Sequence, residues 1–355
     1  MIPYLCLATF PAIFAVIYCT GKDFGVNSNE KTKKVFLAVV GLAIFLMIAL
    51  RSKYNGSTDS LNYYNTWKDL SDASFGQLQD YMKESLMEKG FLLTIWSLSH
   101  IFENPQFIFV FSGALFTIAV CNFIYRNSED MILSTVMFVS LGIYGFMVQG
   151  MRQAMAMSIC LFAIELCKKR NFWHFLAFVG VVLFATFYHT SAIVFLIVYF
   201  LYGLKMNAVS GLAFTLFCGV LIACSNMLVA IGNEIFDSNY GVAVESGGFI
   251  ATAIYVLIVA AAILLKNENE CDKNYSFLIY FTALGMVLYF MRYLSAQAAE
   301  RVSFYFMFGQ MALLPKVLNR LPNREKNIAK IIVFILCIAL YAYRLKSSNY
   351  DFFWQ

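Results

Sequence analysis

Two polar side chains, Arg152 and His189, stand at comparable distances on either side of a basic cluster at 168–170. The apolar runs 154–167 and 172–188 flank that cluster and are typical of the two helices of a membrane hairpin. At about 1.5 Å per residue, residue 152 lies roughly 24 Å and residue 189 roughly 28 Å from the cluster, close to the roughly 30 Å hydrocarbon thickness. We therefore predict that a guanidinium and an imidazole lie at similar depth near one surface. There they could bind an anion or move a proton.

The basic cluster also orients the hairpin, because loops rich in Lys and Arg stay on the cytoplasmic side. Propagating this orientation along the chain places four arginines at or near outer ends of spans, namely Arg51, Arg152, Arg292 and Arg301. A guanidinium binds diphosphate through two hydrogen bonds and stays charged near a low-dielectric boundary. Convergence of the four on an anionic ligand is our interpretation. For any single arginine, snorkelling to lipid phosphates or pairing with a loop acid is an open alternative.

Further candidates lie in the long segment that follows Arg51. Asp59 comes after Gly56-Ser-Thr, Tyr63 and Tyr64 follow it, and Glu88 is a second carboxylate in the same loop. Carboxylates and aromatic rings are the groups that sugar sites use. The alternative for Asp59 is an ordinary turn residue. For His189 the alternatives are a capping residue, a proton acceptor or a diphosphate ligand.

Composition sets the class of protein that must position these residues. The chain has 355 residues, of which 61% are hydrophobic and only 13% charged, and its mean hydropathy is +0.69. Soluble domains do not combine so much apolar surface with so little charge. Long apolar runs without alternation predict an all-α polytopic integral membrane protein. The net charge of +5 is spread over loops between apolar runs, so we expect no nucleic-acid partner.

We predict about 12 transmembrane helices in a single membrane domain, 1–355, with an external loop insertion at 51–105. The basic loop at 20–34 should lie inside, which puts both ends of the segment 90–102 outside. This segment is short and contains His100, so we predict a re-entrant or interfacial helix that does not span. The predicted apolar segments are 2–19, 35–50, 90–102, 106–125, 131–148, 154–167, 172–188, 190–204, 208–232, 249–265, 275–294, 302–315 and 328–343.

Deep ionisable residues are almost absent from the predicted spans, and this bears on the kind of function. Glu165 is the exception, and pairing with Lys168 or Lys169 near the inner surface explains it. Ion-coupled transporters usually need buried acids near the membrane midplane, so the pattern favours an enzyme. The nine cysteines include no CxxC pair and no Cys/His cluster, so we expect neither a metal site nor a cofactor.

The motifs, taken in order, resemble the EpsG family of exopolysaccharide polymerases, which are related in role to Wzy-type polymerases. The resemblance covers residues 51–306. It is carried by Arg51 with the run Gly56 to Tyr63, by Glu88-Lys-Gly-Phe91, by Met151-Arg152-Gln153-Ala154-Met155-Ala156 with Phe187-Tyr188-His189-Thr190-Ser191-Ala192, and by Arg301-Val-Ser-Phe-Tyr305-Phe.

This resemblance implies metal-independent glycosyl transfer at the outer face of a bacterial cytoplasmic (inner) membrane. The substrate would be an oligosaccharide repeat unit linked to undecaprenyl diphosphate, and membrane lipid, a flippase and a chain-length regulator would be partners. The arginines would stabilise the departing diphosphate, and a base would deprotonate the acceptor hydroxyl. The implied catalytic residues are Arg152 and either Asp59 or His189; the implied substrate-binding residues are Arg51, Arg292, Arg301, Gln153, Tyr63, Glu88 and Tyr305.

Two other functions fit part of the pattern. In a transporter or flippase of lipid-linked sugars, the same arginines would bind diphosphate without chemistry. In a non-catalytic scaffold of a polysaccharide assembly system, they would bind no substrate at all. The missing midplane acids and the gathering of polar residues on one side favour the polymerase over the transporter.

Overall fold

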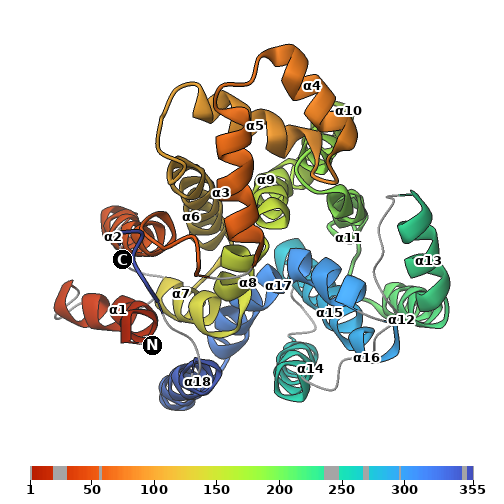
Figure 1. Cartoon of the computed structure of the whole chain (residues 1–355). Helices are drawn as coiled ribbons and strands as arrows, with labels where there is room; N and C mark the ends of the chain where they lie inside the picture. Colours follow the sequence, from red (N-terminus) through yellow and green to blue (C-terminus); the bar gives the residue numbers. More distant parts are fainter. Residues whose placement is uncertain are drawn as a thin grey trace. The chain divides into compact units, whose positions relative to one another are not determined.

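The computed structural model describes residues 2–18, 30–55, 58–235, 248–266, 272–295, 297–345 and 350–354, and these are mainly α-helical (Figure 1). No strand occurs among them, apart from one isolated bridge pair. The elements in chain order are α1 (Ile2–Tyr18), α2 (Glu30–Ala49), α3 (Thr58–Leu70), α4 (Phe75–Glu84), α5 (Lys89–Ser99), α6 (Phe107–Asn127), α7 (Met131–Ser140), α8 (Ile143–Gln149), α9 (Met151–Cys167), α10 (Phe172–Thr186), the 3₁₀ helix η1 (Thr190–Leu196), α11 (Ile197–Leu201), α12 (Ala208–Ala223), α13 (Ser225–Ile235), α14 (Phe249–Leu264), α15 (Lys273–Phe290), α16 (Arg292–Ser295), α17 (Gln297–Leu318) and α18 (Asn323–Arg344).

Every apolar segment predicted from the sequence coincides with one or two of these helices, so the all-α prediction is confirmed for the described residues. By length and composition, α2, α6 and α18 are each long and apolar enough to cross a membrane. The count rises to five if two bent pairs are each one span, and several shorter apolar helices accompany them. This count of three to five does not confirm the predicted twelve spans.

Breaks within apolar runs explain part of this difference. Helices α7 and α8 meet at an angle of 51°, and α12 and the first part of α13 meet at 65°. Between α7 and α8, Gly142 adopts a φ of 96°, a left-handed conformation that only glycine reaches without steric cost. A periodic apolar pattern does not reveal such a bend, because both halves remain apolar.

The chain forms two compact units, and each is described by itself. Unit 1 contains residues 1–165, 179–193 and 331–355, and unit 2 contains 166–178 and 194–330. The boundaries fall inside α9, α10, η1 and α18. The prediction of one membrane domain stays a prediction.

In unit 1, α2 packs along α6, α1 packs on α7, and α5 packs against both α3 and α4. Figure 1 shows α3, α4 and α5 grouped together, and they occupy the predicted insertion 51–105. The sequence predicts one helix in this insertion, and α5 is that short helix. Helices α3 and α4 are additional. Ser74 begins α4 with a capping box, in which its hydroxyl and the side chain of Gln77 satisfy each other's backbone N–H groups.

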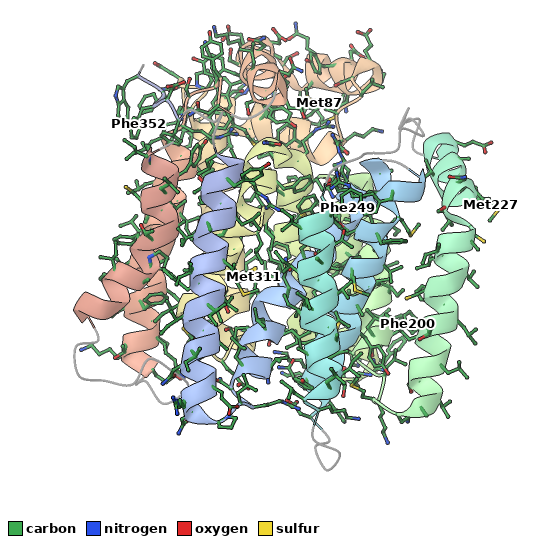
Figure 2. The ribbon with its side chains drawn as sticks, turned by 90° about the horizontal axis from the view of Figure 1, so that it is seen from below. Met87, Phe200, Met227, Phe249, Met311 and Phe352 are labelled. Carbon is green, nitrogen blue, oxygen red and sulfur yellow. The ribbon has the colours of Figure 1, made fainter. Side chains whose placement is uncertain are left out.

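The insertion is tied to residues 350–354, which we call the 350–354 strap. Figure 2 shows Met87 of the insertion and Phe352 of the strap at the same end of unit 1. Arg51 and Phe352 form an isolated antiparallel bridge. The Asn55 side chain donates to the Asp351 carbonyl and accepts from the Asp351 N–H at 3.2 Å. The other links run from Ser52 N to Asp351 O (2.8 Å), from Phe353 N to Leu50 O (3.0 Å) and from Tyr350 Oη to Met47 O (2.9 Å).

In unit 2, the helices α15 and α17 form the central pair, and α14 packs against both. Helices α11 and α12 also contact α15, and α13 contacts α16. The α15–α17 core is aromatic, with Phe195, Phe281 and Phe306 in mutual ring contact. The predicted external loop at 233–247 lies almost wholly outside the described residues, as does the predicted turn at Gly56-Ser57.

The 350–354 strap generates a first prediction. The substitution Asn55→Ala removes both side-chain hydrogen bonds to Asp351, which costs roughly 1–3 kcal/mol locally at roughly 0.5–1.5 kcal/mol for each bond. In hydrogen-exchange mass spectrometry, amides of the strap should exchange roughly 5- to 150-fold faster than in the wild type. The exposed Asn62 of α3 supplies the control, since Asn62→Ala should leave strap exchange unchanged. Equal exchange in Asn55→Ala and wild type would contradict a stable strap.

Candidate functional site

The Arg152 side chain, at the start of α9, joins two other segments of unit 1. Its Nη1 donates to Oε2 of Glu88 at 2.5 Å, and its Nε donates to the hydroxyl of Tyr63 at 3.3 Å. Glu88 is the N-cap residue of α5, and Tyr63 lies on α3. The Arg152 and Glu88 side chains are 25% and 13% exposed, so the ion pair is largely but not fully desolvated. We call Arg152, Glu88 and Tyr63 the arginine triad.

The triad leaves donor groups for a ligand. The Nη2 of Arg152 makes no hydrogen bond to the described residues, so one arm of the guanidinium fork is available. Burial raises the pKa of the Tyr63 phenol, while the adjacent Arg152 guanidinium opposes that rise. The phenol is therefore protonated at neutral pH, and its hydrogen can be donated while its oxygen accepts from Arg152. Such a pair can bind an anion.

Asp59 lies one helical turn before Tyr63, in the first turn of α3, and its side chain is partly exposed. Its negative charge acts on Tyr63, where it raises the pKa of the phenol. Among the described residues, the Asp59 carboxylate has no hydrogen-bond or ion-pair partner. An unengaged carboxylate thus lies next to the arginine triad, and its role as a base stays a prediction.

The segment 187–192 docks on the beginning of α5. Gly90 N donates to Phe187 O at 2.9 Å, and Thr94 Oγ1 lies 3.1 Å from the Tyr188 hydroxyl. A Cβ on Gly90 would lie only 2.6 Å from the Phe187 carbonyl oxygen, so this close approach requires glycine. The helix that begins at Glu88 therefore contacts Arg152 through a side chain and the 187–192 segment through its backbone.

His189 lies in that segment, with 9% of its surface exposed. Its Nδ1 is 2.7 Å from Ser191 Oγ, and the Ser191 N–H also points to Nδ1 at 3.3 Å. The imidazole is thus held locally at the start of η1. Gln153, next to Arg152 on α9, is buried, with 3% of its surface exposed.

Arg51 takes no part in the hydrogen bonds of the triad; it lies at the junction of the insertion and the strap and is 1% exposed. Its Nη1 donates to Asn55 O at 2.6 Å and to Ser60 Oγ at 3.1 Å, and its guanidinium stands 4.3 Å from the centroid of the Phe109 ring. Gln106 donates to the Arg51 carbonyl at 2.9 Å. Burial lowers the pKa of Arg51 to about 10, so the side chain stays charged at neutral pH. These contacts position the start of α3; substrate binding by Arg51 stays a prediction.

Unit 2 contains a second buried arginine. Arg292 Nη1 donates to the Tyr289 hydroxyl and to Glu300 Oε1, both at 2.6 Å, and the guanidinium lies over the rings of Tyr289 and Tyr293. Arg301 is exposed at the beginning of α17. Glu300 was not among the predicted site residues. Its position directly before Arg301 and eight residues after Arg292 is a sequence signal for it.

Tyr305 lies in the core of unit 2, where it is 1% exposed and its ring stands 6.2 Å from that of Phe195. The predicted site residues are divided between the two units. Unit 2 contains Arg292, Arg301 and Tyr305, and unit 1 contains the others. The convergence of Arg51, Arg152, Arg292 and Arg301 on one ligand involves both units and stays a prediction. Within the described ranges, no group of three or more His, Cys, Asp or Glu side chains could hold a metal ion.

Comparison with protein families gives one match, to a model described as the EpsG family, over residues 34–355. The chain belongs to the EpsG family. The predicted resemblance is confirmed, and the arginine triad and the segments that dock on α5 all lie within the matched range. Membership indicates an exopolysaccharide polymerase in a membrane, and thus a polymerase-type glycosyltransferase in general. Comparison with curated proteins and with solved structures gives no match.

The contact between Gly90 and Phe187 generates a second prediction. Gly90→Ala forces the beginning of α5 away from the 187–192 segment, and overpacking of this kind costs roughly 1–3 kcal/mol. We expect a lower melting temperature in detergent and loss of most polymer formation in cells. Gly76→Ala on α4 is the matched control, because nothing lies within 4 Å of its Cβ position. Normal polymer formation by Gly90→Ala would show that the docking is not needed.

Proposed function

We propose that this EpsG-family chain is a glycosyltransferase that joins oligosaccharide repeat units carried on undecaprenyl diphosphate. We further propose that it crosses the bacterial cytoplasmic membrane twelve times and works at the outer face, without a metal ion. The observation that carries the proposal is the arginine triad, since it unites the conspicuous residues of three separate segments. A largely desolvated ion pair with one guanidinium arm left for a ligand, a phenol and a nearby carboxylate fit a lipid diphosphate leaving group and a sugar acceptor.

In this reaction, the acceptor hydroxyl of a new repeat unit attacks the anomeric carbon at the lipid-linked end of the growing chain. The new glycosidic C–O bond forms while the C–O bond to diphosphate breaks, and the lipid diphosphate leaves with the electron pair. Arg152 stabilises the negative charge that develops on that leaving group. A guanidinium is always protonated in water, so it supplies positive charge without a cation.

Asp59 is the base that the contacts favour. It takes the proton of the acceptor hydroxyl, and its carboxylate is unengaged and close enough to Tyr63 to affect its pKa. Glu88 compensates the charge of Arg152 and holds its guanidinium in place. His189 is the second candidate, but its Nδ1 is already engaged by Ser191. We therefore assign His189 a structural role next to the site rather than proton transfer.

Substitutions in the triad test the enzymatic function. With lipid-linked repeat units isolated from a strain that lacks this chain, the reconstituted wild type should make long polymer even with a chelator present. Arg152→Ala should lower the rate at least about 100-fold, as expected for loss of transition-state charge stabilisation. Asp59→Asn should lower it roughly 100- to 10,000-fold by removal of the base. Arg126→Ala, which removes an exposed arginine paired with Glu165 at 3.5 Å, is the control.

Three outcomes would contradict this function. Long polymer made by both Arg152→Ala and Asp59→Asn would exclude catalysis by these residues. Repeat units that fail to reach the outer face of cells lacking the chain would favour the flippase. A requirement for added divalent cation would refute the metal-independent mechanism.

The proposed orientation has its own test. In a variant without native cysteines, a cysteine at the exposed Glu84 of α4 should react with an impermeant maleimide in intact cells. A cysteine at the exposed Lys169, between α9 and α10, should react only after the membrane is permeabilised. Equal labelling of both positions in intact cells would place the insertion and the basic cluster on one side, contrary to the proposed topology.

A further inference from the structure

The insertion also carries a cluster of aromatic rings, formed by Phe75 of α4 and by Trp96 and His100 near the end of α5. Trp96 on α5 is the centre of this cluster. The ring centroid of Phe75, from α4, lies 5.8 Å away in an edge-on arrangement, and that of His100 lies 4.5 Å away. Phe75 is 54% exposed, His100 is exposed and Trp96 is partly exposed. We call Phe75, Trp96 and His100 the aromatic platform.

Hydrogen bonds hold the platform in one conformation. The indole Nε1 of Trp96 donates to the Ala73 carbonyl at 2.7 Å, and His100 Nδ1 lies 2.8 Å from the Trp96 carbonyl oxygen. The capping box of Ser74 fixes the first turn of α4, on which Phe75 lies. The rings are therefore ordered before any ligand arrives, which reduces the entropy lost on binding.

The surroundings of the platform carry polar side chains as well as the exposed apolar residues Leu93 and Ile101. Asp72 and Ser74 flank Ala73, the residue whose carbonyl anchors Trp96, and both are exposed. The exposed positions of α3, which packs against α5, carry only amide and charged side chains, namely Asn62, Asn65, Lys68 and Asp69. A lipid-facing surface of this composition would be costly to desolvate. Exposed rings beside carboxylates and amides fit a ligand with both apolar and hydroxyl-bearing faces.

A sugar ring is such a ligand, because its C–H face packs on an aromatic ring while its hydroxyls hydrogen-bond to carboxylates and amides. The platform is also continuous with the candidate active site. Glu88 of the triad is the N-cap residue of α5, and Trp96 of the platform follows eight residues later on the same helix, a rise of roughly 12 Å. An oligosaccharide attached at the triad can therefore extend along α5 to the platform.

We propose that Phe75, Trp96 and His100 form a saccharide subsite that stacks a sugar ring of the growing polysaccharide and retains the chain near the arginine triad. This inference rests on the proposed polymerase function and adds a binding site for its product. Retention raises the effective concentration of the chain at the site, so that further repeat units are added before the chain dissociates. The subsite therefore controls polymer length without taking part in bond formation.

Polymer length and the first joining step separate this subsite from the catalytic site. In the reconstituted assay, Trp96→Ala should join the first two repeat units at the wild-type rate, because no platform residue contacts the triad. The mean polymer length should fall by about 2- to 12-fold, in line with loss of one aromatic stacking contact. Trp96→Phe keeps a ring and should restore most of the length. Trp173→Ala, which removes an exposed tryptophan of α10, is the control.

Each result of this assay decides one question. Wild-type length in both Trp96→Ala and Phe75→Ala would overturn the subsite while leaving the polymerase intact. A Trp96→Ala variant that fails to join even two units, yet melts like the wild type, would also overturn it. Absence of any polymer with the wild type would instead refute the proposed function.

Tryptophan fluorescence tests the ligand directly and separates sugar from lipid. Oligosaccharides from partial hydrolysis of the wild-type polymer should change the emission of the wild type, and the change should be absent in Trp96→Phe. Brominated phosphatidylcholine vesicles should quench wild type and Trp96→Phe to the same extent. Quenching that is lost in Trp96→Phe, with no response to oligosaccharide, would assign the platform to the membrane surface and overturn the proposal.

Discussion

The ion pair between Arg152 and Glu88 is the interaction on which the candidate site depends. It is largely desolvated, so neither charge could persist there alone without a cost of several kcal/mol. The pairing also determines where the Arg152 side chain lies relative to α5, because Glu88 is the N-cap residue of that helix. Arg152 is thereby held against the insertion, and its Nε reaches Tyr63 on α3. A single charge pair thus brings residues from three distant parts of the sequence into one constellation.

A second constraint acts at the entrance to the insertion. Arg51 is buried beneath the beginning of α3, and the 350–354 strap pairs with the backbone on either side of it. These contacts fix the direction in which α3 leaves α2, and α3 carries both Asp59 and Tyr63. The buried guanidinium of Arg51 thus has a structural task that is distinct from that of Arg152. Two arginines that look equivalent in the sequence have different surroundings.

The arginine triad and the aromatic platform are linked through α5, since Glu88 is the N-cap residue of this short helix and Trp96 lies within it, and they suit different tasks. The triad combines charges that are partly shielded from water, which strengthens electrostatic interactions with a developing anion. The platform is open to solvent and lacks a buried charge, which suits weak, repeated binding of a neutral sugar face. In the proposed reaction, the triad would act at the bond that breaks and the platform would retain the long product. Helix α5, which is too short to span a membrane, connects these two tasks.

The sequence by itself determined the all-α class and the position of almost every apolar helix, because hydrophobic runs are local features. It also determined the family, since the order of the Arg51, Glu88, Arg152 and His189 motifs needs no structure. Only the tertiary structure decided which of these residues meet. The pairing of Arg152 with Glu88, the burial of Arg51 and the engagement of His189 by Ser191 depend on side-chain contacts, most of them between distant segments. Helices α3 and α4 were missed for a related reason: both pack on α5, and α4 begins with a capping box, but neither has an apolar run of its own.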